Sequence, residues 1–575
     1  MRLYSERRGL GVHPTHEYAG THRYADTKSW LVPNYFVVGI EEPNSHRQNE
    51  DQVMNTLDYI IVAVYALAFL GLGYFFKDQK DGKDYFLGGK SFGWLPLGLS
   101  IMATQLSAIS FISAPAFVGL REGGGLEWLS FEFGVPVAML FLMAVLIPPL
   151  YNAGIVSIYE YLERRFSAST RLLLSAVFLI SRAFATGVMV YAVSIILESV
   201  LGVSFFTTLG IIGVITLIYS LQGGMKAVVY GDMIQMIILF LGILLCMGFA
   251  LAEIGGWEAF TAQLDRDRLD AVDFSGWGFQ KGEEFGFWPM LLGGFFLYVS
   301  YYGTDQSQAQ RTLSARDMGV VRKTLLFNGL IRFPVTLTYC VMGLIIGTLV
   351  ATTPAFQAAV PADKPDMMIP VFIRDYLPHG VIGLLIVAIL SAAMSSLSSA
   401  INSLSAVTVE DFIARGKTLK DGDYMRYSRY TAFAWGLVCI VLAAYAGEIA
   451  DTVIEAINKI GSVFYGPILA TFLLAIMTRR THALGANIGL ATGVLVNIYL
   501  WLYVPEVFWF WWNAIGAALT LIVGYGASRL LPGRAKEVVI DFKMDWNRLL
   551  GWEAALLVGF LVLIIGISWS LKYVF

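Results

Sequence analysis

The stretch Gly293-Gly-Phe-Phe-Leu-Tyr-Val-Ser-Tyr-Tyr-Gly-Thr-Asp305-Gln306 ends an apolar segment, 287–304, that is long enough to cross a bilayer. It is nevertheless poorly suited to a continuous helix, because glycine weakens helices and the segment closes on Thr304, Asp305 and Gln306. Inside hydrocarbon, freed backbone groups must be satisfied within the protein, so broken helices occur where backbone lines a cavity. The stretch therefore predicts a broken membrane helix beside a site for an ion or a solute.

A second apolar segment, 94–118, has the same character. It carries several polar residues and a proline in apolar surroundings: Thr104, Gln105, Ser107, Ser110, Ser113 and Pro115. The two segments are five spans apart, which is typical of a transporter built from two inverted five-helix repeats whose first helices are both interrupted. Small and hydroxylated residues also allow close helix packing, but the matched pair favours the transporter interpretation.

The composition is that of a membrane protein. Hydrophobic residues make up 57% of the 575 residues and charged residues 14%, whereas a soluble chain carries about 25% charge. The net charge of −3 gives no sign of a nucleic-acid partner. Cys246, Cys340 and Cys439 fall in apolar runs and are expected to pack as core residues. The sequence has no nucleophile elbow, no phosphate-binding glycine loop beside a lysine, and no Cys/His cluster, so we do not expect an enzyme.

Fourteen apolar segments predict an all-α polytopic membrane protein. They are 57–76, 94–118, 127–150, 171–200, 204–221, 228–253, 287–304, 324–350, 379–404, 429–446, 450–476, 484–504, 507–528 and 552–574. Lysine and arginine collect after the first, third, seventh, ninth, eleventh and thirteenth segments, all on one side, whereas the opposite loops, such as 265–284, are acidic or mixed. By the positive-inside rule the basic loops are cytoplasmic. We therefore expect a multi-pass protein of the plasma (inner) membrane with both termini outside.

The ends of the chain differ from its middle. Residues 1–53 hold four of the six histidines and many charges but no long apolar run, and Met54 then leads into the first span. We expect 1–53 to be a polar leader, or sequence upstream of a true start at Met54. The expected organisation is an additional helix at 54–80, a ten-helix inverted-repeat core at 90–478, and three further helices at 484–575.

The segment 379–404 contains Ala392-Ala-Met-Ser395-Ser396-Leu-Ser398-Ser399. Positions 392, 395, 396 and 399 share one helical face. A hard cation prefers oxygen ligands, including hydroxyls and the carbonyls that a broken helix frees, so sodium is a natural occupant. The alternative is a packing face whose serines bond to their own helix.

Ionisable residues inside membrane spans are costly and mark function by default. Five such residues stand out: Glu132, Arg182, Asp232, Asp305 and Lys459. Asp305 and Lys459 suit structural or gating roles near an interface. Glu132 and Arg182 lie deeper, and they either form a buried ion pair with each other or contact a ligand.

Four motifs resemble the sodium/solute symporter family. They are Lys83-Asp84-Tyr-Phe-Leu-Gly-Gly89-Lys, Tyr159-Glu160-Tyr-Leu-Glu163-Arg-Arg165-Phe, Ile218-Tyr-Ser-Leu-Gln-Gly223-Gly224-Met-Lys-Ala227 with Gly231-Asp232, and Tyr301-Tyr-Gly-Thr-Asp305-Gln306 with Gln310-Arg311. The similarity runs from about Met54 to Phe575. It implies a LeuT-type fold with one helix before the ten-helix core, and relatives that move galactose or sialic acid with sodium.

The resemblance also implies site residues. The first sodium site would use Ala103, Leu106, Ala392, Ser395 and Ser396, and a second, described for the sialic-acid branch, would use Asp232, Ser395, Ser398 and Ser399. The substrate would meet Gln105, Ser107, Ser110, Glu132, Arg182 and Asn458, and a gate is expected at Tyr301, Tyr302, Asp305 and Gln306. Arg182 matches the arginine that meets the carboxylate of sialic acid, whereas Glu132 resembles the glutamate of the sugar branch.

We therefore expect a sodium-coupled symporter that imports a small organic solute by alternating access, with an acidic sugar or another carboxylate favoured. A neutral sugar remains open, since Glu132 would then pair with Arg182. Two further possibilities are a proton-coupled symporter with Asp232 as proton carrier and a transporter-like sensor. The expected partners are sodium, the solute and the lipid bilayer, with no nucleic acid and no obligate protein partner.

Overall fold

Long helices account for most of the chain, as the apolar segments require. The computed structural model describes residues 54–79, 82–106, 108–202, 204–417, 419–445, 453–536 and 550–574. The chain divides into two compact units, Met1–Asp51 and Gln52–Phe575, and all the described residues belong to the second. The expected leader at 1–53 and the expected substrate residue Ser107 lie outside the described residues.

Eleven helical segments of the described chain are long and apolar enough to cross a membrane. Nine are single helices: α1 (Thr56–Phe75), α8 (Ala168–Leu201), α9 (Phe205–Ile254), α13 (Met318–Thr352), α17 (Asp421–Tyr445), α18 (Val453–Met477), α19 (Ala483–Tyr503), α20 (Trp509–Leu530) and α22 (Trp552–Val574). The tenth continues α16 (Val381–Val407) through η7 (Thr408–Ile413). The eleventh is composite, and joins η2 (Leu126–Glu132), α5 (Gly134–Phe141), η3 (Leu142–Leu146) and α6 (Ile147–Asn152). A twelfth is obtained if α3 (Trp94–Gln105) and α4 (Ala108–Gly119) are counted as one bent span.

Shorter helices complete the described part. They are α2 (Gly82–Leu87), η1 (Gly88–Lys90), α7 (Tyr159–Arg165), α10 (Trp257–Gln263), η4 (Arg266–Leu269), η5 (Pro289–Gly293), α11 (Gly294–Thr304), α12 (Gln306–Leu313), α14 (Pro354–Ala359), η6 (Pro365–Met367), α15 (Met368–Tyr376) and η7 (Thr408–Ile413). The sequence count of fourteen spans differs from eleven or twelve because it divides α9 in two and includes 287–304, whose helical parts are short.

Both helix interruptions expected from the sequence are present. α3 ends at Leu106, whose backbone leaves the helical region (φ −80°, ψ 84°), and α4 continues at an angle of 58° to it. α11 ends at Asp305, which is extended (φ −84°, ψ 122°). The Asp305 carboxylate then begins α12, because it accepts a hydrogen bond from the Ser307 backbone N–H at 2.8 Å.

α9 folds back on itself at Gly224. An unbroken helix of 50 residues would be about 75 Å long, more than twice the ~30 Å thickness of the hydrocarbon layer. Gly224 has φ 53° and ψ −149°, a conformation open essentially to glycine alone. Tyr219, before the break, packs on Phe69 with ring centroids 5.7 Å apart, and Gln235, after it, donates to the Tyr65 hydroxyl at 3.1 Å. Tyr65 and Phe69 are one turn apart on α1, so both halves of α9 pass the same turn of α1. The chain therefore reverses at Gly224, and the two halves of α9 lie antiparallel.

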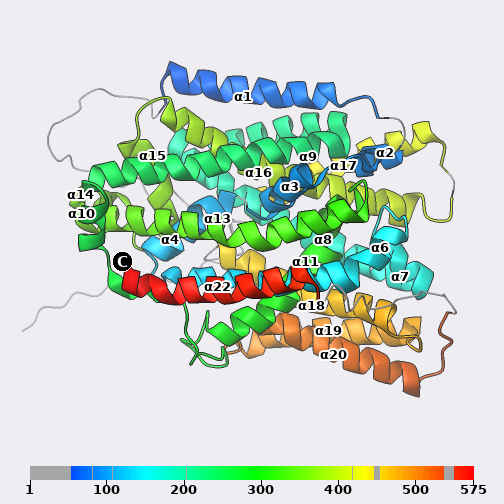
Figure 1. The fold of residues 1–575 in the computed structure, drawn as a ribbon. Coiled ribbons are helices and arrows are strands. Elements are labelled where there is room, and N and C mark those ends of the chain that lie inside the picture. The colour runs from blue at the N-terminus through cyan, green and yellow to red at the C-terminus, as the bar shows by residue number, and fades with distance from the viewer. Residues whose placement is uncertain are drawn as a thin grey trace, which may run out of the picture. The chain divides into compact units, whose positions relative to one another are not determined.

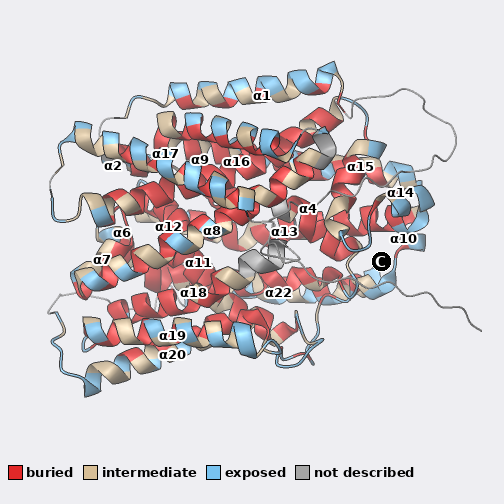
Figure 2. Ribbon diagram, turned by 180° about the vertical axis from the view of Figure 1, so that it is seen from behind, coloured by how far each residue is buried: buried red, intermediate tan, exposed pale blue. Residues whose placement is uncertain are grey.

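Burial separates the inner helices from the outer ones. In α16, 89% of the most apolar stretch is buried inside the protein, against 22% in α1 and 28% in α22. α1 lies on one side of the bundle and α19 with α20 on the opposite side, and all three expose outward faces (Figures 1 and 2). These exposed faces are apolar, as at Leu67, Tyr499 and Ile522. That is the pattern of helices whose outer faces meet lipid rather than water.

Candidate functional site

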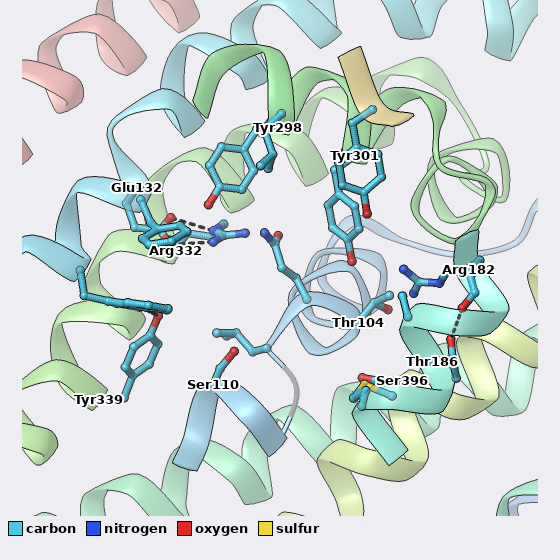
Figure 3. Close-up of a pocket in the computed structure, with 18 residues that line it drawn as sticks. Thr104, Ser110, Glu132, Arg182, Thr186, Tyr298, Tyr301, Arg332, Tyr339 and Ser396 are labelled. Carbon is cyan, nitrogen blue, oxygen red and sulfur yellow. Dashed lines mark hydrogen bonds and ion pairs between the residues drawn. The ribbon is translucent and has the colours of Figure 1, made fainter. Parts of the chain in front are cut away.

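A cavity of about 180 Å³ lies beside the break between α3 and α4 (Figure 3). By volume it has room for roughly a dozen waters. Its lining combines three charged residues, five small polar ones and six aromatics: Glu132, Arg182, Arg332, Thr104, Gln105, Ser110, Thr186, Ser396, Trp128, Phe131, Tyr298, Tyr301, Tyr339 and Tyr465. A mostly apolar wall with a few convergent polar groups is characteristic of a small-molecule site.

Glu132 and Arg332 form a bidentate ion pair on one side of the cavity (Figure 3). The Arg332 guanidinium donates from Nε to one carboxylate oxygen at 2.8 Å and from Nη2 to the other at 2.6 Å. Thr336 donates to the same carboxylate at 2.9 Å. The Arg332 Nη1 also donates to the Tyr302 hydroxyl at 2.9 Å, and that hydroxyl donates to the Gln105 side chain. This network satisfies both charges and holds Gln105 against the break in α3.

Arg182 lies on the opposite side of the cavity (Figure 3), on α8. Its Nη1 is 3.6 Å from a carboxylate oxygen of Asp305, while the other Asp305 oxygen accepts from the backbone and the hydroxyl of Ser307. The Arg182 Nε is buried and has no hydrogen-bond partner among the described residues. The possibility that Arg182 and Glu132 pair with each other is wrong, because Arg332 on α13 occupies both oxygens of Glu132. Arg182 therefore keeps N–H donors available beside the cavity.

The five residues expected to form the first sodium site come from α3 and α16. Ala103 is in the last turn of α3 and Leu106 follows it, in a region where a helix end leaves carbonyl oxygens without intrahelical partners. Ala392, Ser395 and Ser396 are buried on α16. Leu106 and Ser396 line the same cavity, and within the described part of the chain the buried Ser396 hydroxyl has no hydrogen-bond partner. Unpartnered oxygen at a helix break is the donor set that a sodium ion prefers.

The second expected set also converges, but around an arginine. Ser395 donates to Asp232 at 2.6 Å, and Ser398 donates to the Ser395 carbonyl at 3.0 Å. Arg311 of α12 donates from Nη2 to Asp232 at 2.7 Å and to the Ser399 hydroxyl at 2.5 Å. In the described conformation the cation beside Asp232 is therefore the guanidinium of Arg311.

The other expected residues are placed unevenly. Ser110 and Tyr301 line the cavity. Tyr302 is not part of the lining, and its hydroxyl contacts Gln105 and Arg332. Gln306 is fully buried, where its amide bonds the Val156 carbonyl at 2.8 Å and the Ile158 N–H at 3.0 Å. Asn458 belongs to α18, but its side chain lies outside the described residues. Within the described part, no three His, Cys, Asp or Glu side chains gather as metal ligands.

The sequence did not predict two arginines that the structure places at these sites, Arg332 and Arg311. Arg332 lies in the middle of the span 324–350, so the rule that flagged Glu132 and Arg182 applies equally to it. Arg311 was assigned to a basic cytoplasmic loop, because nothing in the local sequence shows that α12 turns inward. The structure buries both arginines.

Comparisons with known proteins identify the family and relatives of similar sequence and fold. The sequence profile of the sodium:solute symporter family matches residues 85–493. The human sodium/iodide cotransporter is 28% identical over 498 residues, covering 84% of this chain and 73% of its own. The sodium-coupled monocarboxylate transporter 1 of Xenopus laevis is 30% identical over 453 residues, covering 77% and 71%. Among solved structures, the substrate-bound outward-open state of a Na⁺-coupled sialic acid symporter has a TM-score of 0.76 at 23% identity, covering 84% of this chain and all of that one.

Proposed function

Because the chain belongs to the sodium:solute symporter family, we propose that it couples sodium entry to the uptake of a small carboxylate-bearing solute. Proteins of this family to which it is similar are sodium-coupled transporters, not enzymes. The solute binds in the cavity beside the α3–α4 break, and sodium binds next to it, between that break and α16. Uptake proceeds by alternating access, with the solute and sodium stabilising a common state.

The observation that carries this proposal is the unpartnered Nε of Arg182. Arginine presents a planar set of N–H donors that fits the two oxygens of a carboxylate. The cavity wall holds two arginines and one glutamate, and Arg332 already neutralises Glu132. One positive charge is left in excess on the wall, and Asp305 offsets it only at 3.6 Å. An anionic solute would complete the hydrogen bonding of Arg182.

The names of the relatives also support an anionic solute. Their names specify iodide, monocarboxylates and sialic acid. All three are negatively charged at neutral pH, although they differ in size and shape. A carboxylate is favoured over a halide here, because the fork of an arginine discriminates by geometry and not only by charge. The aromatic walls supply apolar contact for the remainder of a small organic acid.

The first sodium site is proposed at the carbonyls of Ala103, Leu106 and Ala392 with the hydroxyls of Ser395 and Ser396. Its support is the buried, unpartnered hydroxyl of Ser396 beside the helix break. With no carboxylate among these five residues, the site binds a singly charged ion through dipoles. The membrane potential adds about 2.3 kcal/mol per charge per 100 mV to the driving force for such an ion.

We also propose how the chain is arranged in the membrane. The basic loops lie on the cytoplasmic side of the inner membrane, and both termini lie on its outer side. α1 precedes the transport core, which runs from α3 to α18, and α19, α20 and α22 follow it. The gate is assigned to Tyr301, Tyr302, Asp305 and Gln306, which border the junction of α11 and α12.

Arg182→Lys tests the solute assignment. The lysine keeps the charge and loses the bidentate geometry, so sodium-dependent binding of an acidic solute should weaken by about 1–3 kcal/mol. A thermal-shift screen of monocarboxylates, uronates, sialic acids, iodide and neutral hexoses, with and without sodium, identifies the ligand to be used. Arg171→Lys is the matched control, because Arg171 is a buried arginine on the same helix that pairs with Asp411 and does not line the cavity.

Two outcomes would contradict the proposal. Tight sodium-dependent binding of a neutral hexose, with all acids ignored, would make Arg182 a structural partner of Asp305. Uptake driven by a proton gradient in the absence of sodium would replace sodium coupling by proton coupling.

A further inference from the structure

Arg311 is one of the largest side chains that the described part of the protein buries completely. It projects from α12, the short helix after the break at Asp305. Its Nε donates to the Ser100 hydroxyl at 2.7 Å, its Nη1 to the Ser307 carbonyl, and its Nη2 to both Asp232 and Ser399. Every nitrogen of the guanidinium therefore has an acceptor, and α12 is joined through it to α3, α9 and α16.

Asp232 makes no other ion pair among the described residues. One carboxylate oxygen accepts from Arg311 at 2.7 Å and from Ser100 at 2.5 Å, and the other accepts from Ser395 at 2.6 Å. A fully buried carboxylate that stays ionised needs a positive partner. Arg311 supplies it in this conformation.

The acceptors used by Arg311 overlap the oxygens that suit a small cation. Asp232 and Ser399 belong to the set that the family resemblance implies for a second sodium ion, and Ser395, which donates to Asp232, belongs to both sodium sets. A guanidinium and a sodium ion placed on the same carboxylate would leave one unbalanced positive charge in a buried, weakly screened space. The two cations therefore exclude each other at Asp232.

We propose that Arg311 is a tethered cation that competes with a sodium ion for Asp232. In the conformation seen here the arginine holds the position, and sodium takes it only when Arg311 withdraws. The exchange keeps Asp232 neutralised throughout, and it breaks the links from α12 to α3, α9 and α16. Sodium at this site thereby releases α12, whose first residue, Gln306, belongs to the gate. This inference rests on the sodium coupling proposed above.

Arg311→Gln tests the competition, since glutamine keeps hydrogen-bonding capacity and removes the charge. The variant leaves Asp232 without a cation, so sodium should stabilise it more strongly than the wild type. We expect the sodium concentration for half-maximal thermal stabilisation, measured without solute, to fall at least tenfold, and sodium-dependent uptake to saturate at correspondingly lower sodium. An unchanged or higher sodium requirement overturns the inference.

Two controls separate competition from general damage. Asp232→Asn combined with Arg311→Gln removes both charges and should abolish the gain in sodium affinity. Arg171→Gln removes another buried arginine from its aspartate, Asp411, and should leave the sodium requirement unchanged. A gain that persists in the double variant, or appears equally in Arg171→Gln, would contradict a role for Asp232 and Arg311 as competitors.

A measurement on the wild type covers the case in which Arg311→Gln fails to fold. Hydrogen exchange of Gln306–Leu313 should rise when sodium is added without solute, because sodium releases α12. Unchanged or slower exchange overturns the inference. Wild-type uptake that needs no sodium would instead remove the proposed function, whereas sodium-dependent uptake with unaltered exchange removes only the role of Arg311.

Discussion

Ser396 is the residue through which the first sodium site is most directly tested. Its hydroxyl is buried and finds no partner in the residues that the structure describes, while Ser395 already donates to Asp232. A buried hydroxyl left unpaired costs free energy that a bound sodium ion would recover. Replacing Ser395 and Ser396 together by alanine removes two of about five oxygen ligands.

We expect this double replacement to raise the sodium concentration for half-maximal uptake by about tenfold or more, since one charged contact amounts to about 1.5–3 kcal/mol. Sodium titration of uptake in proteoliposomes measures it. Ser403→Ala is the matched control, because Ser403 is buried on the same helix and donates to the Ala400 carbonyl of its own turn. A double variant with wild-type sodium dependence would remove the first sodium site from the mechanism.

At the residue scale, the sequence located the buried ionisable groups better than it predicted their partners. Glu132, Arg182, Asp232 and Asp305 were all found by their position in apolar spans, and the structure buries or half-buries each of them. Their pairing was not predictable, since Glu132 meets an arginine 200 positions away on α13. Which charge faces which depends on how helices pack, and local sequence carries no direct record of that.

Gly224 sets the geometry of α9 at the scale of the element. Its φ of 53° is strained for any other residue, and a Cβ there would lie 2.7 Å from the Tyr85 carbonyl oxygen. Backbone atoms cannot move aside as a side chain can, so Gly224→Ala combines conformational strain with a clash.

We expect Gly224→Ala to destabilise the protein by about 1–3 kcal/mol from the backbone alone, with the clash adding to it. The measurement is the thermal unfolding midpoint of the purified protein. Gly210→Ala supplies the comparison within the same helix, because a Cβ at Gly210 has nothing within 4 Å. It should be neutral or slightly stabilising, as alanine favours helix. Equal midpoints for the two variants would show that the reversal of α9 does not require glycine at position 224.

Breaks in helices were more predictable than the number of helices. Glycine and polar residues within the apolar segments located the interruptions near Leu106 and Asp305, because backbone chemistry marks them locally. The sequence predicts two spans, 204–221 and 228–253, where the structure has the single element α9. The reversal of the chain at Gly224 explains this difference. The short helices α10 and α14 gave no signal, since six or seven residues cover too few turns to show a periodicity.

For the whole molecule, the likeness to the sialic acid symporter establishes the fold at a TM-score of 0.76. Composition and the length of the apolar segments were sufficient to predict an all-helical membrane protein, since the bilayer allows few other architectures. The relation of the two interrupted spans by an inverted repeat remains a prediction from their spacing. The identity of the solute was less predictable, because it depends on how side chains from several helices shape one cavity.

The attachment of α1 to the rest of the molecule begins at Met54. Asn55 and Asp58 cap the helix reciprocally, with the Asp58 N–H donating to Asn55 at 3.1 Å and the Asn55 N–H to Asp58 at 3.0 Å. The same Asp58 carboxylate accepts from the backbone N–H groups of Gly380 at 2.6 Å and Gly383 at 2.8 Å. Met54 itself is buried. All these contacts lie in the unit Gln52–Phe575.

A chain that begins at Met54 should therefore insert, fold and transport as the full chain does, because it keeps the cap and the anchor of α1. Sodium-dependent uptake and the unfolding midpoint of the two proteins provide the measurement. A chain that begins at Tyr59 is the sharp comparison: it loses Asn55 and Asp58, and with them two bonds to the start of α16, so its midpoint should fall. If the chain from Met54 fails to reach the membrane or to transport, residues 1–53 contribute to the fold or to insertion, and the proposed division of the chain at Met54 is wrong.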